Sequence, residues 1–183
     1  MRVVCISGKA GSGKDEVAQA MKETFEGYGE NVLIVHFADL LKFICEKFFD
    51  WDGKKDEAGR TLLQYVGTNK IRSKSPDFWV DFIANMLEMF DDEWDYVLIP
   101  DCRFPNEFEV LAFYGFDVNL VRVNRPAYMS CLTDFQQEHP SETALDDYPW
   151  DWVIKNDGTI EDLRAEAISL AFDMLRGSRR PAV

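Results

Sequence analysis

The feature that most constrains this chain is a glycine-rich segment close to its beginning. The residues GKAGSGKD at 8–15 follow an apolar run at 2–7 and precede a helical pattern at 14–27. This order places the spacing G-x-x-x-x-G-K between a strand and a helix, where backbone N–H groups and the helix N-terminus converge on phosphate oxygens. Lys14 adds a positive charge for the β- and γ-phosphates. The segment therefore predicts a nucleotide phosphate site, against the structural alternative of a plain glycine-rich turn.

The residue after Lys14 departs from the usual pattern. Asp15 stands where Ser or Thr normally ligates Mg²⁺, and Glu16 follows it, so Ser12 is the only hydroxyl of the loop. A carboxylate can hold Mg²⁺ directly or through water, because hard oxygen ligands suit this ion. A GTP-binding chain needs Asn-Lys-x-Asp after a later strand. The segment NKIR at 69–72 fails at its last position, which favours ATP.

Apolar runs and helical patterns alternate along the chain. We expect strands at 2–7, 31–37, 95–101, 117–125 and 152–156, and helices at 14–27, 38–49, 57–73, about 78–89, from about Phe104 to Gly115, and 160–174. This order predicts one parallel sheet with helices on both faces. No repeat or linker divides the chain, although residues 126–150 are irregular.

Acidic and basic side chains follow two of the expected strands. Asp101 and Arg103 end the third strand and Arg125 ends the fourth, and ligands of open α/β sheets sit at these carboxyl ends. Arginine suits phosphoryl transfer because its planar group binds two oxygens and stays charged. The structural alternative to a ligand-binding role is a salt bridge between Asp101 and Arg103. Strand alternation predicts that Arg122 points outward.

Two further segments carry candidate binding residues. Arg60, Gln64, Arg72 and Trp79 lie along helices that would flank the phosphate loop, where they could hold a monophosphate and stack on a base; Trp79 fits a core position equally well. Near the helix start at Ser141 lies one of only two histidines, so no metal site is expected there.

The composition sets outer limits on function. The 183 residues carry a net charge of -13, which argues against coating DNA or lying on a membrane surface. Mononucleotides remain compatible, because Lys14, Arg72, Arg103 and Arg125 would form a local basic cluster. The four cysteines, Cys5, Cys45, Cys102 and Cys131, are far apart, which favours reduced thiols and an intracellular protein. The first residues are too short an apolar run for a signal peptide, and no run has spanning length.

Several segments together resemble one family, the phage-type deoxynucleoside monophosphate kinases. In order, they are GKAGSGKDEVA at 8–18, FADLLKFICEKFF at 37–49, LLQYVGTNKIR at 62–72, DFWV at 77–80, IPDCRFPNEFE at 99–109, VRVNRP at 121–126, HPSET at 139–143 and VIKNDGTIEDL at 153–163. GKD is the variant of the phosphate loop in this family, and also in some other small-metabolite kinases. Many relatives have Thr at the position of Glu16.

The resemblance implies a single P-loop kinase domain over residues 1–183. Its α/β fold would be a three-layer sandwich of the P-loop NTPase type, with a five-stranded parallel sheet between helices. A helical insertion at about 38–92 would bind the monophosphate, and a lid-like region would span about 126–150.

The implied reaction transfers the γ-phosphoryl group of ATP to a deoxynucleoside monophosphate (dNMP), with Mg²⁺, giving the diphosphate (dNDP) and ADP. Carried over from the family, the ATP side would comprise Gly8, Gly11, Ser12, Gly13, Lys14, Asp15, Glu16 and Asn156. The dNMP side would comprise Phe37, Lys42, Gln64, Arg72, Trp79, Asp101, Arg103 and Glu142. Catalysis would fall to Lys14, Asp15, Arg103 and the lid arginine Arg125, and metal binding to Asp15 and Asp101. Glu142 lies in a matching motif that carries no assigned role.

Two alternatives stay open at this stage. The chain could be a related kinase for another phosphorylated metabolite, such as dephospho-coenzyme A or phosphomevalonate, or a nucleotide-binding regulator without turnover. The expected partners are ATP and a dNMP, with no nucleic acid or membrane, and a homodimer is left open. The expected location is the cytoplasm, which means the host cytoplasm for a phage-encoded chain.

Overall fold

The computed structural model describes residues 1–126 and 132–177 of the chain. Within them, one sheet contains the strands β1 (Arg2–Ser7), β2 (Val32–Ile34), β3 (Tyr96–Cys102), β4 (Asp117–Asn124) and β5 (Trp152–Lys155). Their order across the sheet is β2-β3-β1-β4-β5, and every neighbouring pair is parallel. The predicted parallel sheet is confirmed. β2 is shorter than the predicted run at 31–37.

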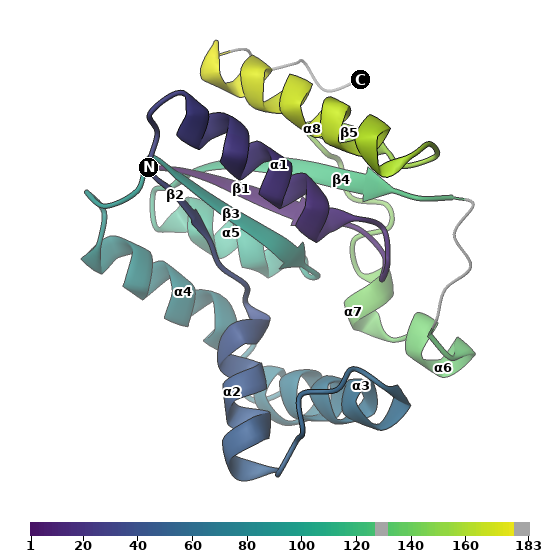
Figure 1. Ribbon diagram of the computed structural model, residues 1–183. Coiled ribbons are helices and arrows are strands. Elements are labelled where there is room, and N and C mark those ends of the chain that lie inside the picture. Colours follow the sequence, from purple (N-terminus) through teal and green to yellow (C-terminus); the bar gives the residue numbers. More distant parts are fainter. Residues whose placement is uncertain (127–131, 178–183) are drawn as a thin grey trace.

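Two layers of helices cover the sheet (Figure 1). α1 (Lys14–Gly27) packs with α8 (Ile160–Leu175) on one face, while α4 (Phe78–Met89) and α5 (Pro105–Phe113) lie on the other. The side chains of β1 alternate between the two cores. Val4 and Ile6 join the core under α1 and α8, and Val3 and Cys5 join the core against α4 and α5. The phosphate loop leaves the end of β1 between these layers.

A separate helical group lies beyond the carboxyl end of the sheet (Figure 1). It contains α2 (Ala38–Phe48), α3 (Glu57–Gln64) and the π-helix η1 (Tyr65–Arg72). The prediction of helix over 57–73 is confirmed to within one residue, but its second half is a π-helix and not an α-helix. The backbone there widens to a five-residue hydrogen bond, in which the N–H of Ser73 donates to the carbonyl of Thr68. The indole Nε1 of Trp79 donates to the Gly67 carbonyl across 3.2 Å, which fixes Trp79 against η1.

The irregular region contains two short helices, α6 (Asp134–Gln137) and α7 (Pro140–Thr143). The buried amide of Gln136 donates to the Glu57 carbonyl and the Thr61 hydroxyl of α3. α7 begins at a cap formed by His139, whose ring nitrogen accepts the Ser141 N–H. The part of the predicted lid at 127–131 lies outside the described residues, and the lid stays a prediction.

The prediction that Arg122 points outward is wrong. β4 is an interior strand, covered on both faces, and the Arg122 side chain donates to the Ser7 hydroxyl and to the carboxylate of Asp146, each across 3.1 Å. Cys5, Cys45 and Cys102 are buried free thiols, and Cys131 lies outside the described residues. Among residues 1–126 and 132–177, we find no helix with the length and apolar character needed to cross a bilayer.

Candidate active site

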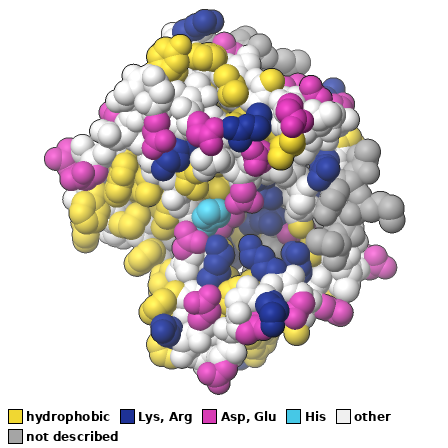
Figure 2. All heavy atoms as spheres, viewed as in Figure 1, with side chains coloured by type: hydrophobic (Ala, Val, Ile, Leu, Met, Phe, Trp, Pro, Cys, Tyr) yellow, Lys and Arg dark blue, Asp and Glu magenta, His cyan; other side chains and the backbone are white. Residues whose placement is uncertain are grey.

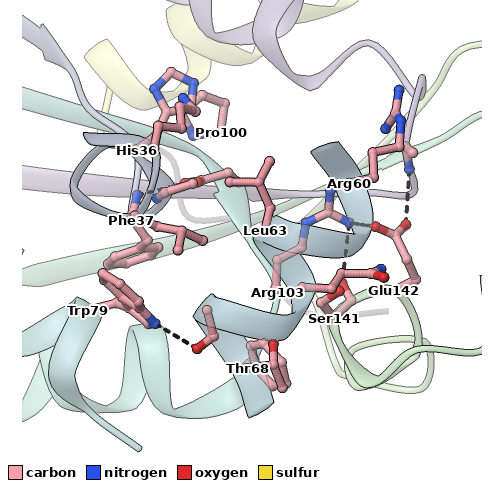
Figure 3. A pocket seen from close by; sticks show the side chains of 18 of the residues that line it. His36, Phe37, Arg60, Leu63, Thr68, Trp79, Pro100, Arg103, Ser141 and Glu142 are labelled. Carbon is pink, nitrogen blue, oxygen red and sulfur yellow. Dashed lines mark hydrogen bonds and ion pairs between the residues drawn. The ribbon is translucent and has the colours of Figure 1, made fainter. Parts of the chain in front are cut away.

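A cavity of about 560 Å³ opens at the carboxyl end of the sheet. It lies between the phosphate loop, the helical group of α2, α3 and η1, the start of α5, and α7 (Figure 3). The predicted site residues that line it are Gly11, Lys14, Asp15, Phe37, Lys42, Gln64, Arg72, Trp79, Asp101, Arg103 and Glu142. Those that the structure does not bring to the cavity wall are Gly8, Ser12, Gly13, Glu16, Arg125 and Asn156.

Basic side chains gather around this hollow, although the chain as a whole is acidic (Figure 2). The lysines and arginines in the cavity wall are Lys14, Lys42, Lys55, Arg60, Arg72 and Arg103. Its aromatic members are Phe37, Trp79 and Phe104. A cavity with both cations and rings in its wall can take an anionic ligand that also carries a flat apolar group.

The phosphate loop has the geometry that its glycines predict. Gly13 has φ of 98°, and a Cβ there would approach the Leu163 side chain to 2.7 Å and the Asn156 amide nitrogen to 2.9 Å. That amide nitrogen donates to the Ser12 carbonyl across 2.9 Å. Asn156 therefore braces the loop from behind, and only glycine fits at position 13.

Lys14 is buried beneath the loop and its Nζ donates to the Lys9 carbonyl across 3.0 Å. Burial, and after it the charge of Arg103, lowers the pKa of Lys14 to about 7. The buried Ser12 hydroxyl has no hydrogen-bond partner among the residues that the structure describes. A loop with a lysine, an unsatisfied hydroxyl and a backbone that excludes Cβ atoms fits a phosphate group.

The two carboxylates predicted to bind Mg²⁺ have different surroundings. Asp15 is mostly exposed, and a hydrogen bond with His36 (3.1 Å) lowers its pKa and raises that of His36. Asp101 accepts the N–H groups of Phe37 and Ala38, each across 3.0 Å, and so holds the start of α2. In the described residues no cluster of three metal-ligating side chains exists. This donor set fits Mg²⁺ carried by nucleotide phosphates with Asp15 as its protein ligand.

Arg103 does not form a salt bridge with Asp101, which was the structural alternative to a ligand-binding role. Its Nη1 donates to Glu142 Oε1 across 2.6 Å, and Glu142 Oε2 accepts the Ala10 N–H of the phosphate loop across 3.1 Å (Figure 3). Lys9 also binds this segment, through the Glu142 carbonyl and the Asp146 carboxylate. Glu142 thereby joins Arg103 to the phosphate loop.

Arg72 is held firmly at the opposite side of the cavity. Its guanidinium lies 4.0 Å from the ring centre of Phe104 and donates to Asn106 Oδ1 across 3.0 Å and to Glu107 Oε1 across 2.6 Å. Sequence reasoning did not identify Glu107 or His36 as site residues. The signal for Glu107 was present, because an acidic residue three positions into a helix that follows a strand commonly accepts backbone N–H groups.

Three predicted site residues have partners within the protein that the sequence did not indicate. Arg125 donates from Nη1 to the Gly11 carbonyl across 3.0 Å, so it lies at the outer side of the phosphate loop. Glu16 forms an ion pair with Arg164 of α8. Lys42 lines the cavity but pairs with Asp39 across 2.8 Å.

Comparison with known proteins places these features in context. The profile of the family described as deoxynucleotide monophosphate kinase matches residues 35–167. The deoxynucleotide monophosphate kinase of Enterobacteria phage T4 is 32% identical over 106 residues, which are 57% of this chain and 41% of that protein. The uncharacterized protein ORF77 of Ictalurid herpesvirus 1 (strain Auburn) is 32% identical over 158 residues, which are 86% of this chain and 64% of that protein. The chain thus spans less than two thirds of either relative.

Solved structures agree with the fold at low sequence identity. The APS kinase CysC of Mycobacterium tuberculosis, in complex with AMPPNP and APS, matches with a TM-score of 0.56 and 15% identity over 92% of this chain and 96% of that one. Shikimate kinase from Aquifex aeolicus matches with a TM-score of 0.51 and 12% identity over 97% of this chain and all of that one. These likenesses establish the three-layer α/β fold of P-loop kinases.

Proposed function

The chain belongs to the deoxynucleotide monophosphate kinase family, and from that premise we propose that it transfers the γ-phosphoryl group of ATP to a deoxynucleoside monophosphate. One observation carries the proposal. A single cavity runs from the phosphate loop to an aromatic wall formed by Phe37, Trp79 and Phe104, with Arg72 and Arg103 lining it. The rings favour an acceptor that carries a base over a non-aromatic acceptor such as phosphomevalonate.

The reaction needs little covalent help from the protein. An oxygen of the acceptor monophosphate is already ionised, so no strong general base is required. Its bond to the γ-phosphorus forms while the bond from that phosphorus to the bridging oxygen breaks, and ADP leaves with that electron pair. Mg²⁺, when bound with ATP beside Asp15, supplies further charge neutralisation.

The side chains of the protein would position the two substrates and neutralise the charge of the phosphates. Lys14 lies beneath the loop that would hold the ATP phosphates, Arg72 faces the acceptor side, and Arg103 lies between them beside Glu142. Arginine and lysine groups held in place before the reaction stabilise the charge of the transition state without reorganising. Arg125, at the outer side of the loop, would act on the same phosphates.

The proposal is tested by ADP release with ATP and each of the four dNMPs. We expect at least one dNMP to stimulate ADP formation strongly, with the matching dNDP as the second product. Two other acceptors serve for comparison: dephospho-coenzyme A, whose accepting group is a hydroxyl, and phosphomevalonate, which carries no base. No stimulation by any dNMP would reject the proposal. In that case turnover with another acceptor would indicate a different kinase, and no turnover at all a nucleotide-binding regulator.

A substitution in the loop gives the first mutational prediction. Lys14→Ala should abolish transfer, because the buried lysine beneath the loop is removed, while the melting temperature stays near that of the wild type, because a buried charge contributes little stability. Kinetics and thermal unfolding are measured on the same preparation. Lys47→Ala, on the exposed side of α2, is the matched control. Turnover of Lys14→Ala equal to that of the wild type would refute the assignment of the loop.

A further inference from the structure

Glu107 is a buried carboxylate that the proposed reaction does not yet use. It lies in the first turn of α5, in the wall of the cavity, and is 2% exposed. Its two oxygens have different partners. Oε1 accepts from Arg72 Nη2 across 2.6 Å, and Oε2 accepts the backbone N–H groups of Arg103 (2.6 Å) and Phe104 (3.1 Å). One side chain therefore joins η1 to the turn between β3 and α5.

A gain in stability does not explain why a charged side chain is buried at this position. Burial raises the pKa of Glu107 to about 7, against the Arg72 guanidinium and the two N–H groups that lower it. A buried ion pair is often no more stabilising than apolar side chains of the same volume. The structure thus gains little stability from this charge, and what the charge does provide is a fixed geometry.

The geometry concerns both arginines of the cavity. Glu107 holds the Arg72 side chain, whose guanidinium also lies over the Phe104 ring, while its other oxygen holds the backbone of Arg103. The Arg103 side chain extends away from this turn to Glu142 and the phosphate loop. Glu107 therefore links the side chain of Arg72 to the backbone of Arg103. In-line transfer depends on the distance between the two guanidinium groups, because the acceptor and the transferred group must be aligned.

We propose that Glu107 is a positioning residue, whose carboxylate fixes the spacing between Arg72, on the acceptor monophosphate, and Arg103, on the transferred phosphoryl group. The inference rests on the proposed function. Glu107 touches neither substrate in this scheme and acts through the two arginines.

The main test is Glu107→Gln. The oxygen of the amide can still accept the two backbone N–H groups, but the NH₂ group faces Arg72 and the ion pair is lost. We expect kcat/KM for the dNMP to fall about 10²-fold, the scale of a misplacement of about 1 Å, with KM for ATP within about threefold of the wild type. Glu109→Gln, an exposed residue of the same helix, should behave as the wild type does.

A double-mutant cycle separates positioning from a merely structural role. If Glu107 acts through Arg72, then Glu107→Gln should cost much less activity in the background of Arg72→Ala than in the wild type. Additive losses would overturn the proposal. So would a wild-type kcat/KM in Glu107→Gln, or an equal rise of KM for both substrates.

Two other results have a defined meaning: a Glu107→Gln variant that does not fold, and a wild-type chain that no dNMP stimulates. Should Glu107→Gln fail to fold, Glu107→Asp decides, because it keeps the charge but withdraws it from Arg72. A loss of dNMP kcat/KM of tenfold or more with an unchanged KM for ATP then supports the proposal, and wild-type kinetics overturns it. A wild-type chain that no dNMP stimulates would instead reject the proposed function, and this result differs from an active wild type whose activity does not depend on Glu107.

Discussion

Arg125 is the predicted lid arginine, and its contact with the phosphate loop leads to a prediction about kcat. It follows β4 directly, and its guanidinium donates to the Gly11 carbonyl of the phosphate loop. In the proposed reaction, Arg125 would neutralise charge that develops on the transferred group in the transition state. We expect Arg125→Ala to lower kcat about 10³-fold, on the scale of arginine fingers, with little change in melting temperature. The measurement is kcat with both substrates saturating.

Two controls sharpen that result. Arg125→Lys keeps the charge but loses the planar fork, so it should recover part of the activity. Arg176→Ala, at the exposed end of α8, should have no effect. If Arg125→Ala kept the wild-type kcat, Arg125 would be only a brace for the loop.

Glu107 also has a consequence for stability. Burial raises its pKa from 4.5 to about 7 in the folded chain, so folding favours the protonated form. The stability that this group contributes is fully present below pH 4.5 and is lost as the pH rises through 7. The melting temperature of Glu107→Gln, relative to the wild type, should therefore rise by several degrees between pH 4.5 and pH 8.

The comparison must be made at each pH with both chains and with Glu109→Gln. Asp101, Arg72 and Arg103 also face this carboxyl, but they are present in every variant and cancel from the difference. A constant difference between Glu107→Gln and the wild type would mean that Glu107 is ionised throughout, with Arg72 outweighing the effect of burial.

At the scale of an element, the turn before α3 packs tightly against the first part of that helix at Gly59. Asp56 accepts the Gly59 N–H across 2.8 Å, and a Cβ on Gly59 would lie 2.0 Å from the Lys54 carbonyl oxygen and 2.7 Å from Trp51 Nε1. Gly59→Ala must therefore displace backbone. We expect a loss of about 2 kcal/mol, or about 5 °C in melting temperature for a chain of this size.

The same substitution should weaken the acceptor site, because the turn and the first part of α3 carry two of the cations that line the cavity, Lys55 and Arg60. KM for the dNMP should rise while KM for ATP stays constant. Gly27→Ala is the control, since a Cβ there meets no atom within 4 Å. Equal melting temperatures for the two variants would contradict the packing argument.

The elements also show what could be predicted from the sequence. β1, β3 and β4 were predicted to within one residue at each end, because their buried apolar runs are bounded by clear breaks. β2 was predicted to extend to residue 37. It ends at Ile34 because the carboxylate of Asp101 binds the N–H groups of Phe37 and Ala38 and so starts a helix there.

In the candidate site, too, local features could be predicted from the sequence and contacts between distant residues could not. The phosphate loop could be predicted from the sequence, because its residues are consecutive and its backbone N–H groups are the atoms expected to bind phosphate. The pairing of Arg103 with Glu142 joins residues 39 positions apart, and that of Arg72 with Glu107 joins residues 35 apart. No local pattern encodes such pairs. The sequence therefore indicated which charges gather at the strand ends, but not which carboxylate holds which arginine.

For the whole molecule, the net charge of -13 has to be reconciled with a site for anions. Six of the 20 lysines and arginines line the cavity, and acidic side chains lie around the hollow (Figure 2). Charges of an exposed surface are screened beyond about 8 Å at physiological ionic strength. A small anion inside the cavity therefore experiences mainly the cations of the wall, whereas a long polyanion would also lie along the acidic surface.

This contrast gives a prediction about ligand size. A labelled DNA duplex of about 20 base pairs should not bind at about 0.15 M salt with protein up to about 100 μM, because non-specific binding depends on many basic contacts along a surface. A fluorescent ATP analogue should bind under the same conditions, and Lys14→Ala should lose that binding without gaining any for DNA. Fluorescence anisotropy measures both ligands. Micromolar binding of the duplex would mean that basic side chains outside the cavity of about 560 Å³ form a surface for polyanions, and the expected preference for small anions would be wrong.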